Sequence, residues 1–313
     1  MSERAPYFSV VTPSFNQAAW FEGCIKSVLA QGIDGFEHIV FDNCSSDGTA
    51  EIAARYPHLR FHAEPDRGQS HALNKALALA RGEIVCWLNA DDQYLPGAFE
   101  IARREFARPD VDVIFGDAEE IFFDGRPSAV RTARFERRED LLIWWEKRTD
   151  LLQPAVFFRR SLLERIGPLR EDLHMIMDTE LWWRMSALCR FHRIDKPLAV
   201  QQRQPDSKTM KHAERIYDEK ARVFWPILCD EHPGQRLHYW LARHRGMGRR
   251  YLGLAQSASR EDRSLALHFL KRSAGENPFV TLTPHWWKAL LFASRQPSGV
   301  ASTRLAQPAS PDA

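Results

Sequence analysis

The stretch Glu83-Ile84-Val85-Cys86-Trp87-Leu88-Asn89-Ala90-Asp91-Asp92 joins a short apolar run to an acidic end. The apolar part, residues 84–88, is typical of a buried strand. Tyr94-Leu95-Pro96-Gly97 follows and predicts the end of that element. In open α/β sheets, ligands bind beyond the carboxyl ends of the strands, so the two aspartates stand where a ligand would arrive. Taken alone, such a pair is more typical of a solvated turn, and the neighbouring segments change that interpretation.

Apolar runs alternate with amphipathic segments on both sides of this stretch. Before it, strands are expected at residues 7–11, 37–41 and 59–63, and helices at residues 18–31, 49–55 and 71–80. After it, helices are expected at residues 97–106, 161–166 and 175–186, strands at 111–115, 153–158 and 193–200, and a hairpin around 121–126. Strand–helix repeats with short polar turns predict an α/β fold with a mostly parallel sheet flanked by helices.

Polar residues follow each of the first four predicted strands. The four clusters are Thr12 with Asn16, Asp42 with Asn43, Asp66 with Gly68, and Asp91 with Asp92. Because the carboxyl ends of parallel strands meet at one edge of a sheet, these clusters predict a single site there.

Charge is unevenly distributed along the 313 residues, whose formal net charge is only +2. Residues 1–210 carry 27 basic and 32 acidic side chains, whereas residues 211–313 carry 16 and 9. A basic end on a mildly acidic body fits either an anionic surface or substrate, or simply solvated helix faces. We expect no nucleic-acid partner.

The five cysteines show neither a C-x-x-C pair nor zinc-ligand spacing, which predicts a reduced, cytosolic protein. The first residues lack the apolar region of a signal peptide, and no run of 18 apolar residues predicts a membrane span.

The composition changes after residue 210, where the periodicity becomes helical. We expect a domain at residues 1–210, a helical region at 211–295 and a disordered tail at 296–313. Pro226, Pro233-Gly234 and residues 246–248 are expected to divide the helical region into three or four helices. The aromatic segment 285–293 either lies on a membrane surface or packs on the first domain, and both interpretations stay open.

Six segments, taken together and in order, resemble the family 2 glycosyltransferases, which are inverting nucleotide-sugar enzymes. They are residues 8–16 (FSVVTPSFN), 40–49 (VFDNCSSDGT), 66–74 (DRGQSHALN), 88–92 (LNADD), 153–160 (QPAVFFRR) and 177–184 (MDTELWWR). The resemblance covers residues 7–210. It implies the GT-A fold, a Rossmann-like sheet of nucleotide-diphospho-sugar transferases, here with a C-terminal helical extension.

The resemblance also implies a donor site for a nucleotide sugar. Thr12 and Pro13 would line the base pocket, and Asp42 or Asn43 would bond the base edge. The other donor-binding residues would be Asn16, Asp66, Gly68, Asn89, Asp91 and Arg203, with Asn89 on a ribose hydroxyl and Arg203 on the diphosphate. Asp42 has an alternative role as a cap for the helix that begins near Thr49.

A divalent cation, Mg²⁺ or Mn²⁺, is implied at Asp91 and Asp92, with Asp92 the direct ligand. Such a cation would neutralise the departing diphosphate. The family often has an acid where Asn89 stands, and asparagine adds no negative charge there.

Asp178 matches the position of the family's catalytic base, which takes the proton of the acceptor hydroxyl. The apolar neighbour Met177 should desolvate Asp178 and raise its pKa. Asp178 could instead cap the helix of residues 175–186, and the two roles are compatible.

The predicted function is therefore metal-dependent transfer of a sugar to a glycan or polyprenyl-linked acceptor, in surface polysaccharide or O-antigen synthesis. The predicted location is the cytoplasm or, peripherally, the inner face of the cytoplasmic membrane. One alternative is a sugar-nucleotide nucleotidyltransferase, although residues 12–17 contain no Lys, Arg or Gly for a triphosphate loop. A catalytically inactive carbohydrate-binding protein is the other.

Overall fold

The computed structural model describes residues 5–122, 127–146, 149–203, 213–258 and 263–295. The chain divides into two compact units, Met1–Leu228 and Cys229–Ala313. The predicted boundary after residue 210 and the predicted tail at 296–313 both fall outside the described residues.

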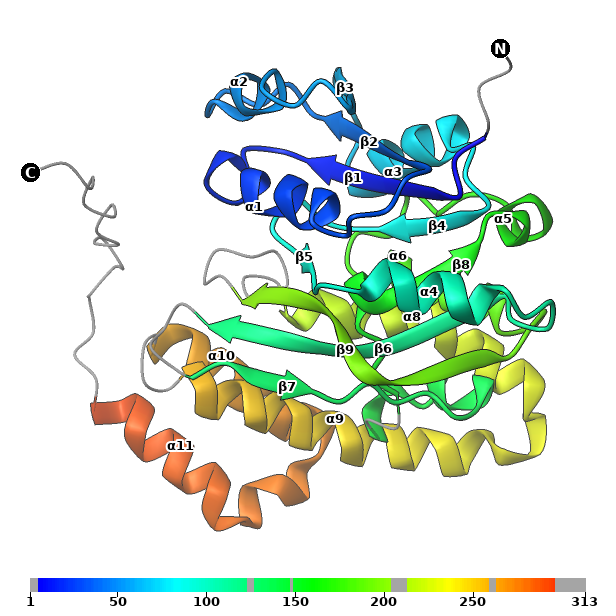
Figure 1. Ribbon diagram of the computed structural model, residues 1–313. Helices are drawn as coiled ribbons and strands as arrows, with labels where there is room; N and C mark the ends of the chain where they lie inside the picture. Colours follow the sequence, from blue (N-terminus) through cyan, green and yellow to red (C-terminus); the bar gives the residue numbers. More distant parts are fainter. Residues whose placement is uncertain (1–4, 123–126, 147–148, 204–212, 259–262, 296–313) are drawn as a thin grey trace, which may run out of the picture. The chain divides into compact units, whose positions relative to one another are not determined.

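A mixed sheet forms the centre of the first unit (Figure 1). Its strand order is β3-β2-β1-β4-β8-β6-β9-β5, and β7 pairs with β6. The first four strands in this order are parallel neighbours: β3 (Leu59–Ala63), β2 (Phe36–Asp42), β1 (Phe8–Ser14) and β4 (Ile84–Trp87). Every residue of β1 and β4 is buried, which explains why β4 is a continuous apolar run and why β1 is mostly apolar. The predicted α/β fold is confirmed.

The other half of the sheet is joined through an antiparallel strand. β8 (Val156–Arg159) pairs antiparallel with β4 and with β6 (Val113–Phe122). β6 runs parallel to β9 (Phe191–Arg203) and antiparallel to the short β7 (Ala129–Arg131), as the predicted hairpin requires. A two-residue strand that the sequence pattern missed, β5 (Gln93–Tyr94), pairs antiparallel with β9.

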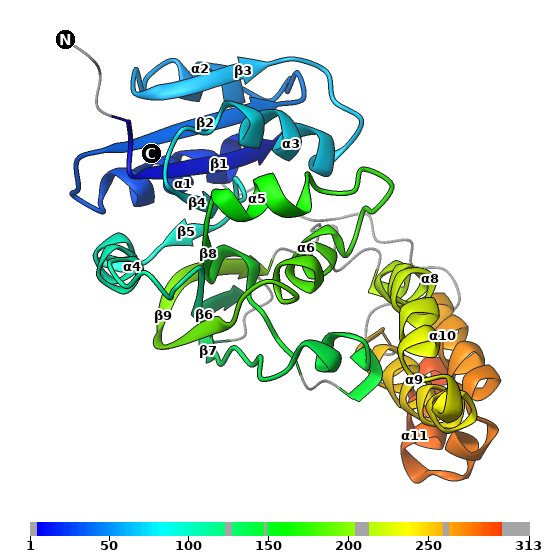
Figure 2. The ribbon, with the colours of Figure 1, turned by 90° about the vertical axis from the view of Figure 1, so that its right-hand side faces the viewer.

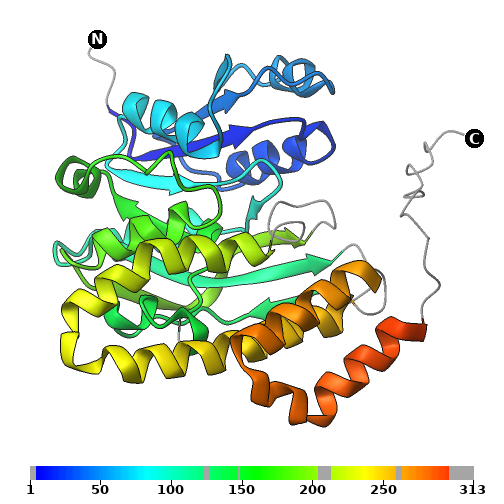
Figure 3. The same ribbon diagram turned by 180° about the vertical axis from the view of Figure 1, so that it is seen from behind.

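Helices cover both faces of this sheet. Figure 1 shows α1 (Ala18–Leu29) and α4 (Ala98–Phe106) on the near face. Figure 3, the view from behind, shows α3 (Gln69–Leu79), α5 (Ser161–Ile166) and α6 (Met177–Met185) on the opposite face. The turned view in Figure 2 separates the two layers. The short α2 (Thr49–Ala53) leads into the edge strand β3.

The start of β4 depends on a close backbone approach at Gly82. A Cβ there would lie 2.5 Å from the backbone nitrogen of Ser9, closer than any real contact. The Gly82 N–H donates to Ser9 Oγ (2.7 Å), which in turn donates to Glu37 Oε1 (2.6 Å). Glycine is therefore needed here, and these bonds set where the strand that carries the aspartate pair begins.

Several predicted strands have different limits in the structure, among them those predicted at residues 153–158 and 111–115. Residues 153–155 form a 3₁₀ turn, η3, and the strand begins only at Val156. β6 continues seven residues beyond its predicted end at Phe115. It passes through acidic residues because their charges are paired: Asp117 with Arg193 at 2.8 Å, and Glu120 with Arg203.

Four helices follow β9 among the described residues: α8 (Ala213–Glu231), α9 (Arg236–Ala258), α10 (Arg263–Glu276) and α11 (Pro284–Arg295). Two 3₁₀ turns, η4 (Pro233–Gln235) and η5 (Pro278–Leu282), lie between them. The predicted breaks at Pro226 and at residues 246–248 are wrong, because α8 and α9 run through them.

Packing explains both continuous helices. Phe224 and Leu228 are buried on either side of Pro226, so tertiary contacts hold α8 across its missing hydrogen bond. At Gly248 a Cβ would lie 2.6 Å from Asn277 Cβ, so this glycine lets the end of α10 approach α9 rather than ending the helix. None of the described helices has the length and apolar character needed to cross a bilayer.

Candidate functional site

A pocket of about 790 Å³ opens at the edge where β1, β2 and β4 end. Ten of the twelve predicted site residues line it: Pro13, Asn16, Asn43, Asp66, Gly68, Asn89, Asp91, Asp92, Asp178 and Arg203. They come from segments as far apart in the chain as β1 and β9. The fold thus brings the predicted donor, metal and base positions into one cavity.

The other two predicted residues, Thr12 and Asp42, are buried outside the pocket lining. β1 continues through Thr12, whose hydroxyl lies 2.9 Å from His38 Nε2 within the sheet. Asp42 accepts hydrogen bonds from the backbone N–H (2.7 Å) and hydroxyl (2.6 Å) of Ser45. Both side chains hold the scaffold together, and neither belongs to the pocket lining.

The alternative capping role for Asp42 belongs to a different residue. Asp47 Oδ1 accepts from the Thr49 hydroxyl (2.6 Å) and backbone N–H (3.2 Å), where α2 begins. Asp47 Oδ2 also accepts from the Ala18 N–H (2.8 Å) at the start of α1. The loop after β2 thus anchors two helices through Asp47.

Asparagine side chains link the loops that form one wall of the pocket. Asn16 has a left-handed backbone (φ +52°), and its Oδ1 accepts from the Ser46 N–H at 3.1 Å. Asn43 Oδ1 accepts from the Asp66 N–H at 2.9 Å, and Asp66 Oδ1 accepts from the Gly68 N–H at 2.7 Å. The loops after β1, β2 and β3 are therefore one connected structure.

Gly68 is the last residue in this series of contacts. Its φ is +123°, a backbone conformation that residues with a Cβ rarely adopt. This backbone conformation therefore requires glycine, and Gly68 is the residue immediately before α3. This is a conformational reason for the glycine, in addition to the close approach to a nucleotide that the sequence predicts.

The aspartate pair lies on the pocket wall immediately after β4. Asp92 is only 2% exposed, and its Oδ1 accepts from the Gln202 N–H at 3.4 Å. Burial, reinforced by the charge of Asp91, raises the pKa of Asp92 well above its usual value. Burial likewise raises the pKa of Asp91, although the positive charge of Arg203 opposes the change. The half-buried Asp91 and the buried Asp92, both with a raised pKa, therefore form a place where an added positive charge would favour their ionised forms.

The donor atoms at this position fit a small divalent cation. Among the described residues, no cluster of three or more His, Cys, Asp or Glu side chains could hold a metal ion by itself. A hard cation commonly binds one or two carboxylates together with water and substrate phosphate oxygens, and Asp91 and Asp92 supply that number. Gln202, 8% exposed on the pocket wall, also has a buried Oε1 without a hydrogen-bond partner.

Asn89 uses all its hydrogen-bonding positions within the protein. Its Nδ2 donates to Asp92 Oδ2 (3.2 Å) and Gln153 Oε1 (2.9 Å). Its Oδ1 accepts from Trp87 Nε1 (2.9 Å) and Gln69 Nε2 (3.0 Å). Asn89 therefore orients Asp92 within the protein, and the predicted contact with a ribose hydroxyl stays a prediction.

Asp178 lies at the start of α6 and faces the pocket. Its Oδ1 accepts from the backbone N–H (2.6 Å) and hydroxyl (3.2 Å) of Thr179. Burial raises its pKa, in the predicted direction, while the bonds from Thr179 and the charge of Lys220 oppose the change. A carboxylate with a raised pKa is a better proton acceptor than a solvated one.

Arg203, at the end of β9, is held on the pocket wall by an acidic partner. Its Nε donates to Glu120 Oε1 at 2.7 Å, and Arg131 Nη1 donates to the same oxygen at 2.9 Å. Arg131 also forms a bidentate ion pair with the carboxylate of Asp150. Arg203 is therefore fixed in direction by side chains from β6 and β7.

The pocket also contains residues that the sequence motifs did not single out as site residues, among them Phe15, Gln17, Trp20, Gln153 and His174. Phe15 is 56% exposed, unusual for a large apolar side chain next to a buried strand. The hydroxyl of Ser14 and Oε1 of Gln17 are buried without hydrogen-bond partners. The only sequence signal for Phe15 was an apolar residue placed inside a polar loop.

Residues 9–167 match the family described as "Glycosyl transferase family 2". An uncharacterized protein of Mycobacterium tuberculosis (strain CDC 1551 / Oshkosh), MT1568, is 30% identical over 247 residues, covering 71% of this chain and 76% of that protein. The putative teichuronic acid biosynthesis glycosyltransferase TuaG of Bacillus subtilis (strain 168) is 38% identical over 99 residues, covering 30% of this chain and 39% of TuaG.

Two solved structures share the fold at low sequence identity. S. aureus TarS 1-349 in complex with UDP-GlcNAc has a TM-score of 0.59 at 19% identity, covering 91% of this chain and 88% of that chain. The mannosyltransferase PcManGT of Pyrobaculum calidifontis, in complex with GDP-Man and Mn²⁺, has a TM-score of 0.55 at 22% identity, covering 93% and 87%. These similarities confirm the predicted GT-A fold, and the family match extends over half of the sequence. The chain belongs to glycosyl transferase family 2.

Proposed function

We propose that this protein transfers a sugar from a nucleoside-diphosphate donor to a hydroxyl of a glycan or lipid-linked acceptor, with inversion at the anomeric carbon. The observation that carries the proposal is that Asp91, Asp92 and Asp178 line the same pocket. A carboxylate pair for a cation beside a separate base is what a single displacement of a diphosphate needs.

The donor nucleotide would occupy the part of the pocket built by the loops after β1, β2 and β3. The exposed ring of Phe15 can stack on a base, and unpartnered oxygens of Ser14 and Gln17 can accept hydrogen bonds from it. Bound UDP-GlcNAc in TarS and bound GDP-Man in PcManGT support a sugar nucleotide as ligand and leave either base open.

The diphosphate would lie against Asp91, Asp92 and Arg203. Mg²⁺ or Mn²⁺ held by the two carboxylates would neutralise charge on the departing nucleoside diphosphate, as the Mn²⁺ in PcManGT supports. Arg203, directed by Glu120, would place a guanidinium on the same group and form charge-assisted bonds to phosphate oxygens.

Asp178 would act on the acceptor side of the donor sugar. As the acceptor oxygen bonds to the anomeric carbon, its proton passes to the Asp178 carboxylate, and the bond from the anomeric carbon to the diphosphate oxygen breaks. The raised pKa of Asp178 favours this proton transfer.

A donor panel tests this function. Purified protein is incubated with UDP-, GDP- and dTDP-sugars, with Mn²⁺ or EDTA, and release of nucleoside diphosphate is measured. We expect one donor to be hydrolysed slowly with Mn²⁺, and Asp178→Asn to keep nucleotide binding while losing transfer to an acceptor. Pyrophosphate release from a nucleoside triphosphate would instead identify a nucleotidyltransferase, and absence of any turnover would identify an inactive binding protein.

The pathway we propose is cell-surface glycan assembly, such as polysaccharide or O-antigen synthesis. The named role of TuaG in teichuronic acid biosynthesis supports this assignment. A lipid-linked acceptor would place the protein at the inner face of the cytoplasmic membrane.

Exposed apolar side chains on α11 and η5 support peripheral contact between the protein and that membrane. These side chains are Phe279, Leu282, Trp287, Leu291 and Phe292, and Lys288 lies beside them on the exposed side of α11. Trp and Lys at the rim of an apolar face favour binding to an anionic lipid surface. Co-sedimentation of the full chain with phosphatidylglycerol vesicles tests the contact: Trp287→Ala combined with Leu291→Ala should abolish it, whereas unchanged binding would contradict it.

A further inference from the structure

The loop between α5 and α6 carries part of the pocket, since His174 and Met175 belong to the lining just before Asp178. One side of this loop is held by α3. The Asn74 side chain bonds both the C=O and the N–H of Leu169 (2.9 Å each), and the Ser70 hydroxyl donates to the C=O of Leu173 at 3.2 Å. These hydrogen bonds therefore attach the loop to α3.

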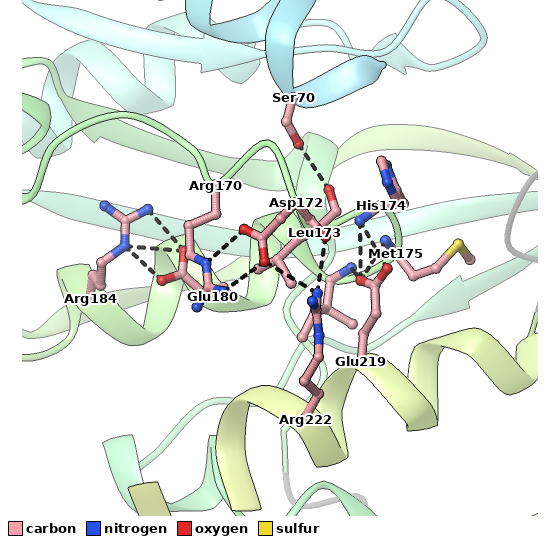
Figure 4. Close-up of polar contacts among 11 residues, drawn as sticks. Ser70, Arg170, Asp172, Leu173, His174, Met175, Glu180, Arg184, Glu219 and Arg222 are labelled. Carbon is pink, nitrogen blue, oxygen red and sulfur yellow. Dashed lines mark hydrogen bonds and ion pairs between the residues drawn. The ribbon is translucent and has the colours of Figure 1, made fainter. Parts of the chain in front are cut away.

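The other side of the loop is held by Glu219 of α8 (Figure 4). Its carboxylate accepts from the backbone N–H groups of His174 (3.0 Å), Met175 (2.8 Å) and Ile176 (3.3 Å). These groups lead into the first turn of α6, where N–H groups have no partner within the helix. The residue at the N-cap, Ile176, has no side-chain capping bond. Glu219, from a distant part of the chain, instead binds the N–H of Ile176 and those of the two residues before it, which places a negative charge at the start of the helix.

Further contacts fix α8 to the same region. Arg222 Nη2 donates to the C=O of Asp172 at 3.0 Å and lies 3.3 Å from its Oδ2, as Figure 4 also shows. The buried ring of Phe224, also on α8, meets the ring of Trp183 of α6 edge-on, with the ring centroids 6.2 Å apart. Polar and apolar contacts together hold α8 along α6.

We propose that Glu219 is a positioning residue for Asp178. Glu219 is not part of the pocket lining, so it acts through the backbone of residues 174–176, which begin the turn that carries Asp178. Loss of this carboxylate frees three backbone N–H groups immediately before α6 and lets the turn shift. This inference rests on the proposed role of Asp178 as the base. It implies that α8, through Glu219, is needed to hold Asp178 in position for the reaction.

Glu219→Ala and Glu219→Gln test the proposal in the full-length protein, with Asp218→Ala as the control for loss of a carboxylate from the adjacent, exposed position of α8. Transfer kinetics, binding of UDP or GDP with Mn²⁺, and the melting temperature are measured for each. We expect Glu219→Ala to lower kcat about 10- to 100-fold, as for other small displacements of reacting groups, with donor KM and nucleotide Kd within about threefold. Glu219→Gln keeps an acceptor oxygen and should recover much of kcat.

The outcomes separate this inference from the proposed function. Wild-type protein that binds no nucleotide contradicts the proposed function itself, and the inference falls with it. Wild-type transfer with unchanged kcat in Glu219→Ala overturns only the positioning role. Parallel loss of kcat, nucleotide affinity and melting temperature in both variants also overturns it, because the effect is then general unfolding. If Glu219→Ala does not fold, Glu219→Leu takes its place, because leucine fills similar space without an acceptor oxygen. Wild-type kcat in a folded Glu219→Leu overturns the proposal, and reduced kcat with intact nucleotide binding supports it.

Discussion

The side-chain amide of Asn89 donates to the carboxylate of Asp92, with 3.2 Å between Nδ2 and Oδ2. The second amide hydrogen goes to Gln153, so Asn89 joins the aspartate pair to the turn before β8. An aspartate at residue 89 would have the same shape and no hydrogen to donate. The neutral amide is therefore what allows Asp92 to be buried in a satisfied network.

Asn89→Asp should destabilise the cation-free protein by about 1–3 kcal/mol, since a buried network loses its donors and gains a like charge. Mn²⁺ should offset much of this loss, because three carboxylates then face a cation. Denaturant unfolding with EDTA and with Mn²⁺ measures both effects. Asn277→Asp is the control, because its side-chain oxygen caps η5 and an aspartate can do the same. Equal stability of Asn89→Asp and wild type in EDTA would show that the network contributes nothing.

Thr12 offers a direct comparison between the sequence prediction and the structure. Its hydroxyl is buried against His38, whose pKa burial lowers to about 3, so the histidine is neutral at physiological pH. Thr12→Val should cost about 1–3 kcal/mol of unfolding free energy and leave nucleotide affinity unchanged. Thr12→Ser keeps the hydroxyl and should lie nearer to wild type. A loss of nucleotide affinity at unchanged stability would restore Thr12 to the base pocket.

Lys220 should set the lower pH limit of transfer. The proposed base, Asp178, must be ionised, so activity falls as pH drops through its raised pKa, and the positive charge of Lys220 holds that pKa down. Lys220→Met removes the charge, raises the pKa of Asp178 further and moves the acidic limb of the kcat profile to higher pH. Arg215→Met, a change of an exposed cation on the same helix, is the control. An unmoved or lowered limb would separate Asp178 from the observed titration.

Glu120 should govern how well Arg203 meets the diphosphate. Glu120→Gln leaves Arg203 and Arg131 facing each other without the shared carboxylate that fixes them. We expect nucleoside diphosphate to bind about 5- to 10-fold more weakly, which corresponds to about 1 kcal/mol. Glu119→Gln, the neighbouring position on β6, should change little. Titration calorimetry with the nucleotide measures both variants, and equal affinity would mean that Arg203 needs no anchor.

The sequence was sufficient to predict the position of the pocket, because Asn43, Asp66 and Asp91 each follow a parallel strand and the carboxyl ends of these strands lie at one edge of the sheet. It was not sufficient for contacts between segments far apart in the chain. Asn89 meets Gln153, 64 residues away, and Glu219 meets Met175, 44 residues away. Neither pair leaves a local pattern, since any polar residue would fit the periodicity of its own segment.

Strand and helix ends failed to follow local signals wherever tertiary contacts decided them. β1 runs two residues beyond Thr12, which places that side chain inside the sheet and away from the pocket. Gly248 and Pro226 resemble helix breakers, yet close packing on Asn277 and burial of Phe224 keep both helices intact. These outcomes depend on neighbours that a single sequence does not reveal.

The carboxylate pair also links cation binding to pH. Burial raises the pKa values of Asp91 and Asp92, so the stability associated with their protonated forms is present at low pH and is lost as pH rises through those values. A divalent cation binds the ionised pair. The rise in melting temperature on addition of Mn²⁺ should therefore increase with pH over the same range.

Titration calorimetry of UDP and GDP into the protein, with Mn²⁺ and with EDTA, tests the central claim most directly. We predict that one nucleotide binds with Mn²⁺, that EDTA weakens its binding by at least about tenfold, equivalent to about 1.4 kcal/mol, and that Asp92→Asn loses the Mn²⁺ dependence. Nucleotide binding of equal strength in Mn²⁺, in EDTA and in Asp92→Asn would contradict a cation held by the aspartate pair against the diphosphate.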